Sequence, residues 1–402
     1  MLQLRPWLPV VTLMISVFAF NTSEFLPIGL LTDIARDLSM TEAEAGRIIT
    51  GYAWIVSIMS LPLMLLVSRI ECRRLMLAVV GMFILSNAAS SLADGFWSLM
   101  AARAGVACAH AIFWSIVTPL AVLAAPRGHQ RAALSLIVVA SSVAMILGLP
   151  LGRALGLLAG WRLTFLSIGA VAGISFVLLV TVFPPVPSRN AVSLKELPAL
   201  LARPEIWGIY LITAVTITGH FTVYTFIEPF LAQIAHFAES SITWMLSIFG
   251  IVGIAASILY ANFYGKCPRF FVVASLAGIA LFPALLLPAA QSAAALCVAC
   301  VLWGLAIGFF NLVFQASIIR FAPSGTAVVM SIYSGIYNVG IGGGALAGGL
   351  VCTHASLSVV GFWGGGIAAA SVLFCLLWFL RTFQSAERSA AERTAAGSGT
   401  EL

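Results

Sequence analysis

The sequence PPVPSRNAVSLKELPALLARPE, residues 184–205, is the longest polar stretch in the interior of this 402-residue chain. It combines prolines, charges and hydroxyl side chains, which end helices and favour loops. On either side the chain consists of apolar runs of about 20 residues, the length that an α-helix needs to cross a bilayer. The stretch therefore predicts a central loop between two apolar halves, residues 1–183 and 206–380.

Six apolar runs precede this loop and six follow it. We predict an all-α polytopic membrane protein with 12 transmembrane helices in two six-helix halves. The first run begins like a signal peptide, with Arg5 before apolar residues, but no small-residue cleavage site follows, so we interpret it as an uncleaved span. The predicted spans are residues 8–32, 48–67, 75–93, 97–122, 132–158, 163–183, 206–230, 241–263, 269–288, 292–318, 326–352 and 356–380.

The composition of the chain points to lipid as its main solvent. Hydrophobic residues make up 61% of it and charged residues only 8%, whereas soluble domains carry about a quarter charged residues. This composition argues against a soluble enzyme and against a secreted disulfide scaffold. The formal net charge of +6 comes from basic residues dispersed between apolar runs, so we expect no nucleic-acid partner.

The basic residues instead predict the orientation of the spans. Cytoplasmic loops of membrane proteins carry an excess of Lys and Arg. The termini and the loops on their side of the membrane hold 15 of the 20 basic residues, so both termini are predicted to be cytoplasmic. These 15 are Arg5, Arg69, Arg73, Arg74, Arg127, Arg131, Arg189, Lys195, Arg203, Lys266, Arg269, Arg320, Arg381, Arg388 and Arg393.

Two halves of similar length are typical of secondary transporters, whose halves rock about a shared site near the midplane. Residues 184–205 would be the cytoplasmic loop between the halves, and residues 381–402 a small polar cytoplasmic tail. We find no nucleotide-binding motif and expect neither a cofactor nor a metal, so an ion gradient or the substrate gradient must supply the energy. Cys297 and Cys300 form a C-x-x-C inside a span, which we interpret as two small packing residues.

Several segments resemble those of one family. FNTSEFLPIGLLTDIARDL (20–38) looks like the first-helix signature of the major facilitator superfamily drug/proton antiporters, and LMAARAGVACAHA (99–111) resembles their buried-arginine motif. LGLPLGR (147–153) resembles a variant of their Gly/Pro antiporter motif, and Gly160-Trp161-Arg162 stands where they have a G-W-R turn. Within this family the sequence is most similar to the bacterial sugar efflux transporter (SotB) branch, in the segments TSEFLPIGLL, YAWIVSIMSLPLML, AHAIFWS, LGLPLGR and YTFIEPF.

The sequence also departs from this pattern at two places. The loop between spans 2 and 3, which the family uses as a conformational latch, has Ser68 in place of an acid and Glu71 in place of a glycine. Span 5 has Arg153 and Ala154 where paired glycines are expected, although Pro150 can still bend the helix. By resemblance, conformational roles fall on Arg69, Arg73, Gly148, Pro150 and Gly152.

Ionisable residues inside a span are costly, so their default interpretation is functional. Glu24 in span 1 and Arg103 in span 4 lie at depths compatible with pairing. One hypothesis is that Glu24 exchanges a proton while Arg103 changes partner between states. The other is a permanent ion pair between the two spans. Asp33 closes the first-helix signature near the outer surface, where it either contributes to coupling or is simply solvated.

The remaining candidates are polar or aromatic residues that we expect to line a cavity. Aromatic faces stack on the apolar side of a sugar ring, and amide, imidazole and carboxylate groups bind its hydroxyls. Ordinary hydrogen bonding between helices is the alternative for each of them. His220, Tyr224 and Glu228 are expected to form one stripe on span 7, with Glu228 near the outer mouth. The substrate-binding candidates are Asn21, Glu24, His110, Trp114, His220, Tyr224, Asn311, Gln315, Tyr337 and Asn338.

The resemblance implies a monomeric proton antiporter that exports sugars or sugar-like small molecules across a bacterial inner membrane by alternating access. A multidrug/proton antiporter and a sugar uptake carrier remain the alternatives within transport. A membrane enzyme or sensor would need a reactive constellation or a sizeable soluble domain, and the sequence contains neither.

Overall fold

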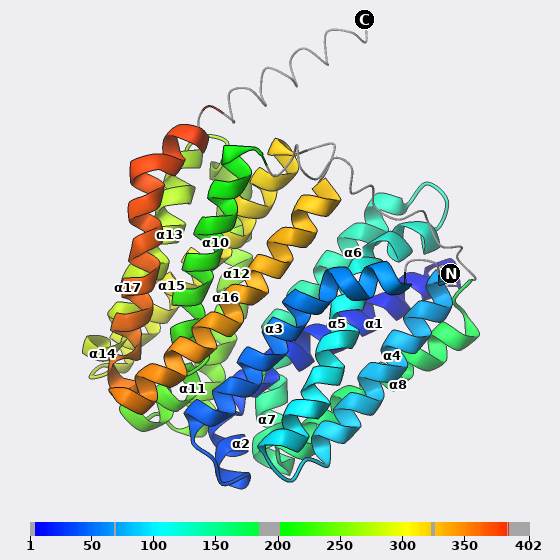
Figure 1. Ribbon diagram of the computed structural model, residues 1–402, viewed down its shortest axis with the longest axis horizontal. Helices are drawn as coiled ribbons and strands as arrows, with labels where there is room; N and C mark the ends of the chain where they lie inside the picture. The colour runs from blue at the N-terminus through cyan, green and yellow to red at the C-terminus, as the bar shows by residue number, and fades with distance from the viewer. Residues whose placement is uncertain (1–4, 68–69, 185–201, 323–325, 384, 386–402) are drawn as a thin grey trace, which may run out of the picture.

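The computed structural model describes residues 5–67, 70–184, 202–322, 326–383 and 385. Arg69, most of the loop 184–205 and nearly all of the tail 381–402 lie outside the described residues. Within these ranges the chain forms helices and no strands, arranged as two bundles of six spans (Figure 1). The predicted all-α fold with 12 spans in two halves is confirmed.

The first half contains six spans and one short helix. Span 5 is built from three consecutive helical segments, and the short helix α2 follows span 1. The bounds are η1 (Arg5–Trp7), α1 (Leu8–Gly29), α2 (Leu31–Asp37), α3 (Glu42–Val67), α4 (Cys72–Ser91), α5 (Phe96–Ala124), α6 (Gln130–Val143), η2 (Ala144–Gly148), α7 (Leu149–Ala159) and α8 (Trp161–Thr181).

The second half repeats the six-span pattern with more interruptions. Its first, third and last spans each consist of more than one segment. The bounds are α10 (Pro204–Tyr224), α11 (Ile227–Pro229), η4 (Phe230–Ile234), α12 (Glu239–Phe263), α13 (Pro268–Ala284), α14 (Leu286–Ala289), α15 (Ala293–Phe321), α16 (Thr326–His354), η5 (Leu357–Val359), α17 (Val360–Phe374) and η6 (Cys375–Phe379).

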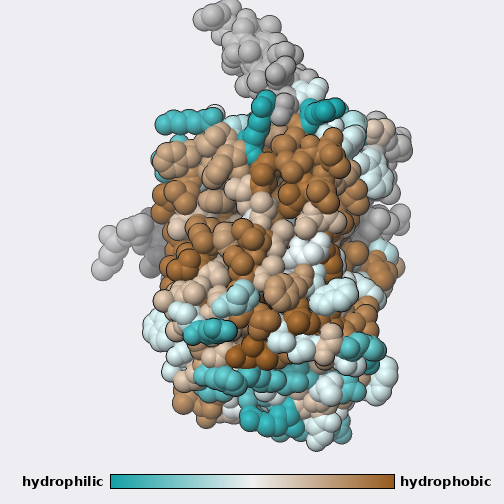
Figure 2. Space-filling model, turned by 90° about the vertical axis from the view of Figure 1, so that its left-hand side faces the viewer, coloured by the Kyte–Doolittle hydropathy of each residue, from teal (hydrophilic) through white to brown (hydrophobic). Residues whose placement is uncertain are grey.

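The surface of this helical structure suits a bilayer. Ten described helices are long and apolar enough to cross a membrane, and the shorter apolar helix α13 is extended by α14. The remaining span, α3, is 26 residues long and carries Glu42, Glu44 and Arg47 near its start. On the face of the second half seen in Figure 2, apolar side chains cover the middle and hydrophilic ones gather toward the two ends.

The first span of the second half breaks near its end, and this break corrects one prediction. Pro229 has no N–H with which to bond the Thr225 carbonyl, and α10 ends at Tyr224 before the single turn of α11. After α10 the hydrogen bonds shorten to the 3₁₀ pattern, in which the Phe226 N–H bonds the carbonyl of Val223, three residues earlier, at 3.0 Å. The predicted stripe of His220, Tyr224 and Glu228 is therefore wrong, because Glu228 lies beyond the break.

The Gly/Pro segment of span 5 packs closely against span 1. Gly148, Gly152 and Gly156 recur every fourth residue, and a Cβ on each would meet Thr22, Leu26 and Leu30 of the first half. Just before Pro150, the π-helix Ala144–Gly148 widens the backbone spacing, which accommodates a residue that lacks an N–H. The two predicted glycines thus serve as a packing face for the end of span 1.

The glycine-rich helix α16 has two faces with different neighbours. Gly340, Gly344 and Gly348 recur every fourth residue and pack against α10 of the same half. Gly335, Gly342 and Gly349 recur every seventh residue and face Ser57, Trp54 and Ala43 of α3 in the other half. Only the second set lies where the two halves could move against each other.

The G-W-R turn ties together the ends of three elements of the first half. Gly160 has φ +85°, a left-handed conformation that favours glycine, and it starts α8. The Trp161 indole donates to Asp37 Oδ2 at 3.0 Å, and Arg162 pairs with the same carboxylate and donates to the Ala93 carbonyl at 2.8 Å. These hydrogen bonds hold the pKa of Asp37 below its usual value, so the ion pair persists at neutral pH and is lost on acidification.

The close α10–α16 packing predicts that Gly344→Ala destabilises the protein. A Cβ there would lie 2.5 Å from the Thr218 carbonyl oxygen and 2.7 Å from the Thr222 nitrogen, and this backbone cannot move aside. We expect a loss of about 1–3 kcal/mol, the usual cost of overpacking. Thermal unfolding of the purified protein in detergent measures it.

The matched control is Gly343→Ala on the next residue. A Cβ there would lie 3.4 Å from the Thr218 hydroxyl, an ordinary contact. We expect its Tm to equal or exceed that of the wild type, since alanine favours the helix. Equal Tm values for the two variants would contradict the packing argument.

Candidate functional site

Arg103 of α5 is a buried anchor between three helices of the first half. Its Nη2 donates to the Ser23 carbonyl at 2.9 Å and its Nη1 to the Ser23 hydroxyl at 3.0 Å. That carbonyl lacks its helical partner because residue 27 is a proline. The Ser23 hydroxyl donates in turn to Asn87 Oδ1 of α4 at 3.1 Å. The guanidinium thus binds α1 where Pro27 has opened its hydrogen-bond ladder.

Glu24 of α1 faces a histidine. Its Oε2 lies 3.7 Å from His110 Nε2, and the Glu24 side chain is 12% exposed. His110 Nδ1 lies 2.9 Å from the Tyr52 hydroxyl of α3. If that hydroxyl donates, Nε2 carries the imidazole proton and directs it at the carboxylate. Tyr52 also lies under the Arg103 guanidinium, 4.6 Å from carbon to ring centroid.

The structure corrects the predicted pairing of Glu24 with Arg103. Among the described residues Arg103 forms no direct ion pair with Glu24, although the two charges interact at longer range. The reason is local: the freed Ser23 carbonyl and the Ser23 hydroxyl take the guanidinium, so His110 becomes the direct neighbour of the carboxylate. Tyr52, Ser23 and Asn87 complete the network, and sequence reasoning missed all three.

The second half contributes an aromatic cluster around His220. The Trp303 indole of α15 donates to His220 Nδ1 at 3.0 Å, so His220 Nε2 carries the proton. The Tyr224 ring stacks on the imidazole with centroids 5.2 Å apart, and Phe249 of α12 packs on Trp303 edge-on. The predicted proximity of His220 and Tyr224 is present. Trp303 and Phe249 were not predicted because nothing marks them within their apolar spans.

Tyr337 of α16 lies on the second-half side of the site. Its hydroxyl bonds the Asn311 side chain of α15, and it interacts electrostatically with both Glu24 and Tyr224. Of the other polar candidates, Asn338 is buried and bonds the Ser334 carbonyl at 3.0 Å, while Gln315 is exposed. Of the predicted residues, the structure thus connects Glu24 with His110, His220 with Tyr224, and Tyr337 with Asn311.

Asn21 and Trp114 lie on the first-half side of this region. Asn21 Nδ2 donates to the Ser141 hydroxyl of α6 at 3.3 Å, an ordinary contact between helices. Trp114 is half-buried, with its ring centroid 6.0 Å from that of His110. Trp114 therefore offers an aromatic face beside the Glu24–His110 pair.

Side chains near the site become more exposed toward the side on which α1 begins, which we call the terminal side; the opposite side is the far side. Along one face of α5, exposure rises from buried His110 through Trp114 to exposed Thr118. The same rise occurs along α1 from Asn21 through Met14 to Val11. On the far side the halves are bonded instead, with α2 and α11 meeting at the lower edge of Figure 1.

Two other predicted residues lie away from the site. Asp33 is on α2 on the far side and pairs with Arg36, Oδ1 to Nη2 at 2.7 Å. Arg73 donates to the Leu179 and Val180 carbonyls at the end of α8, and the Glu71 carboxylate caps α4 by accepting from the Arg73 and Arg74 amides. Among the described residues, this loop therefore binds within its own half.

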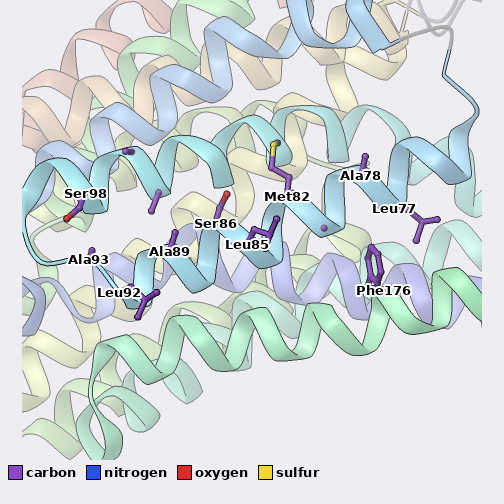
Figure 3. Close-up of a pocket in the computed structure, with 13 residues that line it drawn as sticks. Leu77, Ala78, Met82, Leu85, Ser86, Ala89, Leu92, Ala93, Ser98 and Phe176 are labelled. Atoms are coloured by element: carbon purple, nitrogen blue, oxygen red, sulfur yellow. The ribbon is translucent and has the colours of Figure 1, made fainter.

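A separate groove of about 1010 Å³ runs along the side of the first half (Figure 3). It lies along α4 and α5 and includes Phe176 of α8. Its lining is almost entirely apolar, with only Ser86 and Ser98 carrying polar side chains, and no residue of the Glu24 network lines it. We therefore place the functional site between the halves and not in this groove.

Two six-helix halves that are bonded to each other on the far side, with polar and aromatic residues inside their spans, are typical of a secondary transporter of the alternating-access class. The sequence model of the Major Facilitator Superfamily matches residues 13–228 and 209–400, so the chain belongs to that superfamily. One similar structure is a bacterial homolog of the human lysosomal transporter Spinster, in an inward-facing and unoccupied conformation. Its TM-score is 0.73 at 16% identity, covering 96% of this chain and 98% of that chain.

A second similar structure is a variant of the nucleoside transporter NupG. Its TM-score is 0.72 at 13% identity, covering 92% of this chain and 100% of that chain. At these identities both likenesses concern the fold. The predicted superfamily is confirmed, whereas the sugar efflux branch remains a prediction.

The anchoring role of Arg103 predicts that Arg103→Lys destabilises the protein even though it keeps the charge. An ammonium group cannot donate in parallel to both Ser23 oxygens while lying over the Tyr52 ring. We expect a loss of about 2 kcal/mol, typical of a buried charged hydrogen bond. Thermal unfolding in detergent measures this loss. The control is Arg36→Lys, the same substitution at an exposed residue of the far side. Equal Tm values for the two variants would refute the anchoring role.

Proposed function

We propose that this protein is a monomeric proton antiporter that exports sugars or sugar-like small molecules from a bacterial cell by alternating access. In this proposal the protein lies in the inner membrane and its terminal side faces the cytoplasm, as the excess of basic residues on that side predicts. The conformation described above is then open to the cytoplasm and closed on the outside.

The observation that carries the proposal is the position of Glu24. Its carboxylate lies 3.7 Å from His110 Nε2 of its own half and within electrostatic reach of Tyr337 of the other half. A carboxyl group is a proton carrier, and its neighbours come from both moving parts. A change in the separation of the halves therefore changes the surroundings of this proton site.

The surroundings of Glu24 also support a hydroxylated substrate. The partly buried Trp114 and Tyr224 provide aromatic faces, on which the apolar side of a sugar ring stacks. Glu24, His110, Asn311 and Tyr337 provide hydrogen-bonding groups for hydroxyls. Binding of substrate at Glu24 would compete with its proton, which is the minimum requirement for antiport through a single site.

We predict that Glu24→Gln separates coupling from transport. The amide keeps the size and hydrogen bonds of the side chain but cannot exchange a proton at neutral pH. Transport driven by a pH gradient in sealed vesicles should fall to background, while counterflow, which needs no net proton movement, should persist. Gradient-driven transport equal to that of the wild type would show that Glu24 is not the essential proton carrier.

Glu44→Gln is the matched control for this experiment. Glu44 lies at the exposed start of α3, and among the described residues its carboxylate accepts hydrogen bonds from the Thr41 amide and hydroxyl, three residues away. The Glu44→Gln substitution removes one negative charge from the first half, as Glu24→Gln does, but changes no residue of the site. Both transport modes should therefore equal those of the wild type.

Counterflow also identifies the substrate class. We expect vesicles preloaded with unlabelled arabinose or a thiogalactoside to accumulate the labelled compound, and a lipophilic cationic dye to show no counterflow. Activity with the dye alone would overturn the sugar proposal and favour the multidrug alternative. A protein-free vesicle is the control for leakage.

A further inference from the structure

An ion pair buried between the two halves lies on the far side, outside the Glu24 network. Arg153 of α7 and Glu228 of α11 approach to 3.3 Å between Nη1 and Oε1, and their side chains are 0% and 2% exposed. The first residue belongs to the first half and the second to the second half. This is the same Arg153 that stands where the family resemblance led us to expect a glycine.

Both oxygens of the Glu228 carboxylate bind the first half. Oε1 faces Arg153, while Oε2 accepts from the Thr32 amide at 3.2 Å and from the Thr32 hydroxyl at 2.8 Å. Thr32 lies in the first turn of α2, just after α1 ends. The break before Pro229 places Glu228 on its own short turn, which lets the carboxylate reach across to α2 and α7.

The guanidinium of Arg153 is equally occupied. Besides Glu228, it donates to the Gly29 carbonyl at the end of α1 and pairs with Glu239 at the start of α12. Among the described residues, the charged groups that interact with the pair include Asp33, which pairs with Arg36 on α2, and the 61% exposed Glu239. The network therefore joins α1, α2 and α7 to α11 and α12.

Moving the halves apart on this side would separate the two charges. In an apolar interior a lone charge has no solvent to replace its partner, so separation is favourable only when water enters with it. The Gln233–Glu42 hydrogen bond, also between the halves, is exposed and water can replace it directly. The buried pair is thus the contact that resists opening most strongly.

We infer that Arg153, Glu228 and Thr32 form a far-side lock, which holds the terminal-side-open conformation and must break before the far side opens. This inference rests on the alternating access of the proposed function. It identifies the residues that keep the far side, the outer side in that proposal, closed. It requires neither a sugar substrate nor proton coupling.

Hydrogen exchange of the full chain in lipid nanodiscs tests the lock without substrate. In Glu228→Gln, we expect amides of residues 26–34, 149–156 and 225–235 to exchange at least about fivefold faster than in the wild type. Helix ends on the terminal side should exchange more slowly, because that side closes as the far side opens. Glu44→Gln, at an exposed far-side acid that accepts hydrogen bonds from Thr41 of its own turn, should leave both regions unchanged.

Thr32→Val keeps the ion pair but removes one donor to Glu228, so it preserves a test if Glu228→Gln does not fold. It should raise exchange in the same three segments by a smaller factor. Wild-type exchange in all three segments of a folded Glu228→Gln or Thr32→Val protein would overturn the lock. Because no substrate or pH gradient is used, this result is independent of the vesicle assays that test sugar export.

Discussion

Charge within the membrane-spanning region must find a partner in the protein, because lipid cannot solvate it. The organisation of this chain follows from that constraint. Arg103 binds the Ser23 oxygens, Glu24 faces His110, and Arg153 and Glu228 hold each other across the boundary between the halves. The contacts of Arg103 and Glu24 lie inside the first half, whereas the Arg153–Glu228 pair joins the two halves. The first two contacts therefore stabilise one bundle, and the third stabilises the interface between the bundles.

Prolines decide where these charges find their partners. Pro27 frees the Ser23 carbonyl, and Arg103 takes it. Pro229 breaks the first span of the second half, which lets Glu228 reach Thr32 and Arg153. In each case the proline lacks the amide hydrogen that would complete a helical hydrogen bond. Arg103 donates to the carbonyl left free by Pro27, and Glu228 forms its contacts from the short turn before Pro229. The Glu24–His110 pair lies next to the carbonyl that Pro27 leaves free.

Sequence reasoning located the candidate residues better than it located their partners. Apolar run length and basic loops predicted twelve spans, and the cost of polar groups inside a span singled out Glu24, His110 and His220 as candidates. The permanent ion pair of Glu24 with Arg103, one of the two hypotheses, was wrong, because depth along a helix says nothing of which neighbour a side chain faces. The stripe through Glu228 was wrong because a regular helix was assumed through the residue before Pro229. Tyr52 and Trp303 carried no signal at all, since one aromatic residue in an apolar span is ordinary.

The sequence by itself determined the class of the fold: spans of about 20 apolar residues must be helices that satisfy their own backbone in lipid, and six on each side of a polar loop make two bundles. Only the tertiary structure decided which side of the site is open and which charges close the other. Those contacts join residues far apart in the chain, such as Arg153 and Glu228, and depend on the relative position of two halves that no local pattern encodes.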